Sequence, residues 1–309
     1  MNFLVPQGIG DSVWALLKIQ DISKKIGDGV INVFIACSDA NNTSEARSLE
    51  FVRRFDFVDK CEMYQMPMAG RQGCVLLPGN PADANGLYRY IDSGVTTLPG
   101  IDYVLIPNYT LERGIRIEDW LPEYEINWNV MDHFKFQETN LHKPYVVFFL
   151  ASTAGNTTAG HNRNSIWTPE QWIDLGRRMQ KEFDCRIVIV GANYDMSYYT
   201  DYISPLLRHD DKWFNLIGVL DIGQTFAIVK NARFVISYQS GIGIVANYMN
   251  VPVGIFWRAK GDSISPNSYI SFEEEMASAW AKPGVKFLPL IYGRHDANYI
   301  INEITKQQW

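Results

Sequence analysis

Short apolar runs alternate with amphipathic stretches over both halves of the chain. In the first half, apolar runs typical of buried strands lie at 2–6, 30–36, 60–64 and 101–107, and helical spacing of apolar residues lies at 12–26 and 44–55. In the second half, strands are expected at 144–152, 186–191, 214–217, 234–236 and 253–257, and helices at 168–183, from 196, at 222–230, 244–249 and 295–306. Strand–helix alternation of this kind predicts parallel sheets.

Residues 108–143 fit neither period and are read as a crossing between domains. A chain of 309 residues favours two domains. The expected fold is α/β, with two Rossmann-like domains facing each other across a cleft. The boundaries are an N-terminal acceptor-side domain at 1–135, a C-terminal nucleotide-sugar-binding domain at 136–294, and a helix at 295–309 that packs back on the N-terminal domain.

Charge and cysteine content indicate which partners and which cellular location to expect. The formal charge is −6 and the Lys and Arg residues are scattered, which argues against nucleic acid as a partner. The four cysteines form no C-x-x-C pair, so free thiols and a cytoplasmic location are expected. The N-terminus does not resemble a secretory signal, and no apolar run reaches roughly 18 residues. Peripheral contact with a membrane surface stays open.

The clearest chemical signal is the stretch 234–257, in which an apolar strand leads into a small-residue turn, a helix and a second strand. The turn consists of Gln239, Ser240, Gly241, Ile242 and Gly243. Such a turn at the start of a helix directs backbone N–H groups and the positive end of the helix dipole at one point, which suits a phosphate group. The alternative is a structural turn whose glycines serve packing alone.

A second glycine-rich turn, Gly8-Ile9-Gly10-Asp11, follows the first expected strand. It does not complete G-x-G-x-x-G, because Val13 occupies the last position, and this argues against a nicotinamide or flavin cofactor. A carboxylate directly after such a turn can remove a proton from an acceptor hydroxyl, so Asp11 is the candidate catalytic base. The alternative is that Asp11 only caps the following helix.

Two further segments carry candidate binding residues. The polar loop at 152–167 contains Ser152, Thr153 and Arg163; long loops in compact domains are often functional, and an arginine can hold a diphosphate through two hydrogen bonds. A solvated surface loop is the alternative. Asp195 stands just beyond the strand at 186–191, where a carboxylate can accept hydrogen bonds from a ribose diol or cap the next helix.

Taken in chain order, these segments resemble family 9 glycosyltransferases, the ADP-heptose-dependent heptosyltransferases, which have the GT-B fold. The first turn, at 8–11, is similar to the family's G-x-G-D opening, and 215–218 is similar to its N-L-x-G. Residues 191–195 are similar to its G-G-x-x-E, and 239–246 to its D-S-G-x-x-H-x-A. The resemblance implies that Asp11 is the general base and that Asp195 faces the nucleotide ribose.

Three polar positions depart from the family pattern. Gln239 stands where the family has Asp, Ile244 where it has His, and Ser165 where it has Lys. The resemblance therefore implies the fold and the reaction type but not ADP-heptose specificity. Arg163, or Arg258 with Lys260, could replace the lost positive charge.

The resulting expectation is inverting transfer of a sugar from a nucleotide-diphosphate donor to the hydroxyl of a saccharide or another acceptor. The expected nucleotide-sugar-binding residues are Gly10, Ser152, Thr153, Arg163, Asp195, Gln239, Ser240, Gly241, Ile242 and Gly243. No D-x-D motif is present, so neither a metal nor a cofactor is expected. The alternatives are a non-catalytic nucleotide- or sugar-binding module and a UDP-sugar epimerase, which needs further acid–base groups.

Overall fold

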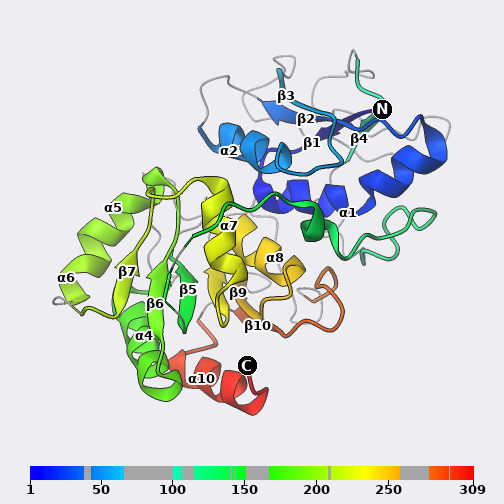
Figure 1. The fold of residues 1–309 in the computed structure, drawn as a ribbon. Coiled ribbons are helices and arrows are strands. Elements are labelled where there is room, and N and C mark those ends of the chain that lie inside the picture. Colours follow the sequence, from blue (N-terminus) through cyan, green and yellow to red (C-terminus); the bar gives the residue numbers. More distant parts are fainter. Residues whose placement is uncertain are drawn as a thin grey trace. The chain divides into compact units, whose positions relative to one another are not determined.

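The computed structural model divides the chain into two compact α/β units, Met1–Lys135 and Phe136–Trp309. The residues described are 1–37, 43–65, 100–105, 107, 115–139, 141–142, 144–150, 167–207, 210–257, 278–291 and 293–309. Both units contain a parallel sheet flanked by helices, as the strand–helix alternation predicts (Figure 1).

The first unit is built on a four-stranded parallel sheet in the order β3-β2-β1-β4. The strands are β1 (Asn2–Val5), β2 (Asn32–Cys37), β3 (Lys60–Gln65) and β4 (Tyr103–Val104). Helices α1 (Ile9–Ile26) and α2 (Thr43–Val52) pack against each other and against this sheet. The expected strand at 101–107 is thus much shorter in the structure, and α1 begins three residues earlier than its apolar stripe.

Residues 115–135, which showed no period, are held against α1 by polar contacts. Lys18 on α1 is almost fully buried and donates hydrogen bonds to the backbone carbonyls of Trp120 and Leu121. The Asn127 N–H donates to the Leu17 carbonyl at 2.7 Å. A short 3-10 helix, η1 (Val130–His133), ends the segment. Seven apolar residues of the segment are buried as well, and they lie on turns and one short 3-10 helix instead of one regular helix or strand: Ile117, Trp120, Leu121, Tyr124, Val130, Met131 and Phe134.

The second unit has a six-stranded parallel sheet in the order β10-β9-β8-β5-β6-β7. The strands are β5 (Tyr145–Phe149), β6 (Arg186–Ile189), β7 (Trp213–Asn215), β8 (Val235–Tyr238), β9 (Val253–Trp257) and β10 (Phe287–Ile291). Edge strand β10 was not expected from the sequence. It contains Pro289, which lacks the N–H needed in a central strand and is tolerated at an edge.

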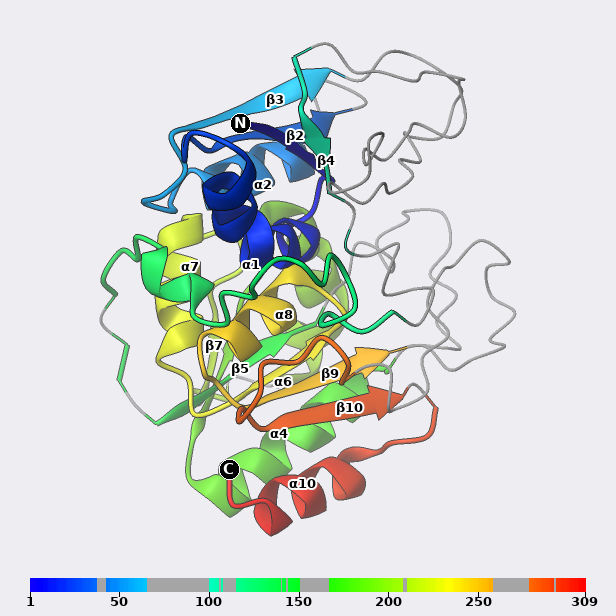
Figure 2. The ribbon, with the colours of Figure 1, turned by 90° about the vertical axis from the view of Figure 1, so that its right-hand side faces the viewer.

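Helices cover both faces of this sheet (Figure 2). Helices α7 (Ile222–Lys230) and α8 (Gly241–Tyr248) lie on one face, and α4 (Pro169–Phe183) and α10 (Ala297–Lys306) on the other. The expected helix from 196 is a broken run: η2 (Asn193–Asp195), α5 (Met196–Tyr198), the π-helical η3 (Tyr199–Ile203) and α6 (Ser204–Leu207). No helix in the described residues is long and apolar enough to cross a membrane.

The C-terminal helix belongs to the second unit. Helix α10 packs against α4, and its residues Ile300 and Ile304 are fully buried in the core of that unit. The expected contact of this helix with the N-terminal domain stays a prediction. A period of apolar residues identifies a buried face but does not say which surface covers it.

Candidate functional site

The two glycine-rich turns both lie where the order of strands reverses. In the first unit, β2 and β3 follow one another on one side of β1, and β4 lies on the other side. In parallel α/β sheets, ligands bind beyond the carboxyl ends of the strands at such a switch point. The turn at 8–11 follows β1 directly, so Asp11 stands at the switch point of its sheet.

Asp11 lies in the first turn of α1 and does not cap it. The N-cap is Gly8, with no side-chain hydrogen bond, so the capping interpretation of Asp11 is wrong. Gly8 has φ +129°, and a Cβ on it would lie 2.7 Å from Asp11 Oδ2, so the carboxylate folds back over the Gly8 backbone. Burial raises the pKa of Asp11 from 3.8 to about 7, opposed by a hydrogen bond from its own N–H.

The second unit reverses its strand order between β5 and β8. From β5 the chain continues to β6 and β7 on one side, and β8, β9 and β10 extend the sheet on the other. The turn 239–243 follows β8, and the turn 191–195 follows β6. Both turns lie at the carboxyl ends of their strands. Because β5 lies between β8 and β6, and neighbouring strands are about 5 Å apart, the ends of β8 and β6 are separated by roughly 10 Å.

The turn after β8 forms the start of α8. The Ser240 side chain caps the helix by accepting from the Gly243 N–H at 3.4 Å, and its Oγ lies 2.9 Å from Ser237 Oγ. The N–H groups of Gly241 and Ile242 belong to the first turn, which has no intrahelical acceptors for them. This arrangement can bind an anion through backbone N–H groups and the helix dipole.

The side chains around this turn are more apolar than the resemblance implies. Ile242 and Ile244 are 8% and 7% exposed, so both contribute to the packing of α8. Gln239 is half-buried, and its N–H donates to the Phe256 carbonyl at 3.1 Å, which extends the β8–β9 pairing. Ile242 can therefore meet a ligand only through its backbone.

Asp195 is 2% exposed, and its Oδ2 accepts a hydrogen bond from the Ala192 N–H at 2.7 Å. This contact closes the η2 turn, and the Asp195 side chain makes no capping hydrogen bond to the helix that begins at Met196, so the capping alternative is not supported. A Cβ on Gly191 would lie 2.8 Å from Asp195 Oδ2, so this carboxylate also folds over a glycine. A contact with ribose stays a prediction.

Three of the expected binding residues, Ser152, Thr153 and Arg163, lie outside the described residues. Gly10 is buried in the first turn of α1. Within the described ranges, no three His, Cys, Asp or Glu side chains gather in a way that could hold a metal ion.

Two supporting residues were missed by sequence reasoning. Ser48 on α2 is 1% exposed and accepts a hydrogen bond from the Gly8 N–H at 3.0 Å. Ser237 on β8 is fully buried and lies against Ser240. A serine inside an apolar strand was the available signal for Ser237, whereas Ser48 sits on an ordinary amphipathic helix 40 residues from its partner.

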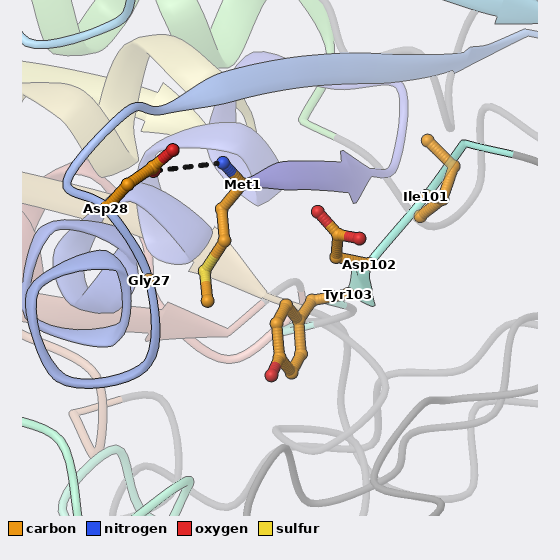
Figure 3. Close-up of a pocket in the computed structure, with 6 residues that line it drawn as sticks. All are labelled: Met1, Gly27, Asp28, Ile101, Asp102 and Tyr103. Carbon is orange, nitrogen blue, oxygen red and sulfur yellow. Dashed lines mark ion pairs between the residues drawn. The ribbon is translucent and has the colours of Figure 1, made fainter.

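A separate cavity of about 560 Å³ lies in the first unit, at the amino ends of β1 and β4 (Figure 3). Residues from the start of β1, the end of α1 and the start of β4 line it: Met1, Gly27, Asp28, Ile101, Asp102 and Tyr103. The Met1 ammonium group pairs with Asp28 at 3.7 Å. The carboxylates of Asp28 and Asp102 make this cavity an unfavourable place for a phosphate. The cavity also lies at the amino ends of the strands, whereas Asp11 lies beyond the carboxyl end of β1.

Comparison with known proteins gives one family match. The model of a family described as "Glycosyltransferase family 9 (heptosyltransferase)" matches residues 112–267, which is just over half of the chain. A search by sequence finds no match among curated proteins.

Several solved structures share the fold over nearly the whole chain. An ADP-heptose lipopolysaccharide heptosyltransferase II from E. coli has a TM-score of 0.59 at 12% identity, covering 99% of this chain and 97% of its own. A family 9 glycosyltransferase from Veillonella parvula has a TM-score of 0.55 at 11% identity, covering 98% and 90%. The E. coli heptosyltransferase WaaC with ADP has a TM-score of 0.53 at 10% identity, covering 100% and 98%. At these identities the likeness shows the fold, and it confirms the expected GT-B class.

Proposed function

Because this chain belongs to glycosyltransferase family 9, we propose that it transfers a sugar from a nucleotide-diphosphate donor to an acceptor hydroxyl. The second unit binds the donor, and the first unit supplies the base. The observation that carries this proposal is the position of Asp11. Its carboxylate follows β1 at the switch point of the sheet, with its pKa raised by burial to about 7.

A carboxylate with this pKa is suited to general-base catalysis at neutral pH. A base works best when its pKa lies near the working pH, because it is then largely deprotonated and still a strong proton acceptor. In the proposed step, Asp11 takes the proton of the acceptor hydroxyl as its oxygen bonds to the anomeric carbon. The bond from that carbon to the diphosphate breaks, and one displacement inverts the anomeric centre.

The diphosphate leaving group requires positive potential. The first turn of α8 offers the N–H groups of Gly241 and Ile242 and the positive end of the helix dipole, with Ser240 holding the turn in shape. Arg163, outside the described residues, is the proposed cation for the same group. No metal or other cofactor is needed in this scheme.

The donor base, the sugar and the acceptor are proposed only by class. ADP is present in one structural neighbour at 10% identity, and ADP-2-deoxy-2-fluoro heptose in another at 9%, so an adenine nucleotide is the first donor to test. A saccharide is the first acceptor to test. A cytoplasmic location is part of the proposal, in keeping with the buried free thiols of Cys61 and Cys185.

The test compares Asp11→Asn with the unaltered protein in two assays. Donor binding, followed by ligand-dependent thermal stabilisation across a panel of sugar nucleotides, should persist. Transfer should fall by at least about 100-fold, the usual contribution of a general base. Asp119→Asn, which removes an exposed carboxylate from the same unit, is the matched control. Transfer that survives in Asp11→Asn would refute the base assignment.

A second candidate function is non-catalytic binding of a nucleotide or sugar. The observation favouring it is that Ile244 is a buried packing residue, whereas the family has a polar His at this position. An active transferase releases nucleoside diphosphate slowly from the donor even without an acceptor. A protein that binds the donor and releases none, with every acceptor tried, would favour this second function.

A further inference from the structure

The orientation of the Asp11 carboxylate depends on the backbone of Gly8. Gly8 has φ +129°, a conformation that residues with a side chain rarely adopt. A Cβ there would meet Asp11 Oδ2 at 2.7 Å and Asp11 Cγ at 3.7 Å, so the carboxylate occupies the space that a side chain would fill. The carboxylate can stay in this place only while Gly8 keeps its conformation.

Both polar groups of Gly8 are held. Its carbonyl accepts from the Ser12 N–H at 2.9 Å, which is the first turn of α1. Its N–H donates to Ser48 Oγ at 3.0 Å, across 40 residues of sequence. The carbonyl contact belongs to any helix start, whereas the contact with Ser48 joins the start of α1 to a second helix. Ser48 is 1% exposed on α2, which packs on α1, β2 and β3, so it is a fixed anchor.

We propose that Ser48 is a positioning residue, which holds Gly8 in the conformation that keeps the Asp11 carboxylate folded against the turn. The proposal rests on the proposed function, in which Asp11 is the base. It assigns Ser48 no contact with substrate. Its hydroxyl acts through one hydrogen bond to the Gly8 N–H, and Gly8 in turn sets where the carboxylate lies.

The electrostatic state of Asp11 fits this role. Burial is the main cause of its raised pKa, and its own N–H is the opposing one. The described ionisable groups of the elements packed on α1 are Arg47 and Glu50 on α2, Glu118, Asp119 and Glu123 in the segment held against α1, and Asp132 and His133 on η1; burial is the largest cause of the shift. The pKa therefore reports how well the carboxylate is shielded from water, which is what loss of the anchor changes.

The experiment measures the Asp11 titration directly in the full chain without ligands. Carboxyl carbon resonances are followed by NMR against pH, and Asp11→Asn identifies the Asp11 signal. In Ser48→Ala, the Gly8 N–H loses its acceptor and the turn relaxes, so the Asp11 pKa should fall by at least one unit. Ser23→Ala is the matched control, because Ser23 is equally buried and hydrogen-bonded at the other end of α1, where its Oγ lies 3.4 Å from the Val30 carbonyl.

Transfer activity provides the second readout. If Asp11 is the base, the midpoint of the pH–rate profile should move to lower pH in Ser48→Ala by the same amount as the NMR titration, with the donor KM unchanged. Ser48→Cys keeps an acceptor at this position but a weaker one, so its shift should be smaller in the same direction. It carries the test alone if the alanine variant does not fold.

The outcomes separate the two proposals. An Asp11 titration that is the same in Ser48→Ala or Ser48→Cys as in the unaltered protein overturns the role of Ser48, whatever the activity. An equal shift in Ser23→Ala also overturns it, because any buried serine would then suffice. A titration that moves while the pH–rate profile does not follow leaves Ser48 as the anchor of Asp11 and removes Asp11 from the role of base.

Discussion

Replacement of Asp11 by Asn should make the folded protein more stable at neutral and alkaline pH. Burial raises the pKa of Asp11 in the folded state from 3.8 to about 7. The folded state thus favours the protonated acid, and folding takes up a proton between these two values. Stability contributed by this group is highest below pH 3.8, falls as the pH rises towards 7, and stays low above it. Asn is neutral throughout and escapes the penalty.

The size of the effect follows from the shift. About three pH units at 1.36 kcal/mol each give at most about 4 kcal/mol above pH 7. The side chain keeps some exposure, and the unfolded chain is not fully solvated, so about 2–4 kcal/mol is expected at pH 8.5. Roughly half of it, about 2 kcal/mol, should develop between pH 5.5 and 8.5, because the unfolded carboxyl is already mostly ionised at pH 5.5.

Chemical denaturation at several pH values measures this difference, followed by a probe of the first unit so that the two units are not averaged. Hydrogen exchange of peptides that contain Trp14 or Trp120, both buried in that unit, reports its unfolding separately at each denaturant concentration. Asp119→Asn gives the baseline for the loss of one exposed carboxylate. A stability difference that does not change with pH, or that favours the unaltered protein at pH 8.5, would refute the view that Asp11 is buried at a cost.

Two further predictions concern packing and charge in the two units. A Cβ on Gly176 would lie 2.2 Å from the ring of Trp213, so Gly176→Ala should destabilise the second unit by about 1–3 kcal/mol in denaturant unfolding. Trp213→Leu should restore most of the loss, and an alanine variant as stable as the original would contradict this packing. Burial lowers the pKa of Lys18 from 10.5 to about 8, with Glu123 foremost among the groups that oppose it, so its charge destabilises the fold below pH 8 and the penalty fades as the pH rises towards 10.5. Measured against Lys18→Met, the unaltered protein should therefore gain about 2 kcal/mol of stability between pH 7 and 10, and a flat difference would count against the burial of a charged amine.

Secondary structure was predictable from the sequence wherever apolar residues follow one period and meet a capping signal. Helix α4 begins at Pro169 after the Thr168 cap, with Gln171 completing the capping box, as its sequence predicts. Edge strand β10 was not expected because Pro289 interrupts its sequence, although its burial alternates along the strand. The segment 115–135 was not assigned because its buried apolar residues lie on turns and a short 3-10 helix.

The candidate site was predictable only as far as its turns. Small residues after an apolar strand mark where a backbone approaches a ligand, and this located the turns at 8–11 and 239–243. The role of each side chain was not predictable in the same way. Asp11 and Asp195 both follow a glycine turn, yet Asp195 is tied to the Ala192 N–H and Asp11 to its own. That difference depends on φ at Gly8 and on Ser48, which come from tertiary structure.

The substitutions at 239 and 244 bear differently on the two parts of donor recognition. The diphosphate is proposed to bind to backbone N–H groups at the start of α8, and these survive any side-chain change that keeps Ser240 as the cap and Gly243 in contact with β8 and β9. A side chain at Gly243 would be tightly packed, because its Cβ would meet Ser237 Oγ at 3.0 Å and Ile255 at 3.1 Å. The exchange of a carboxylate for an amide at 239 and the loss of an imidazole at 244 therefore spare the proposed anion site and act on the part of the donor that side chains contact. It follows that the choice of sugar, and not the capacity to hold a nucleoside diphosphate, is where this chain should differ from its relatives.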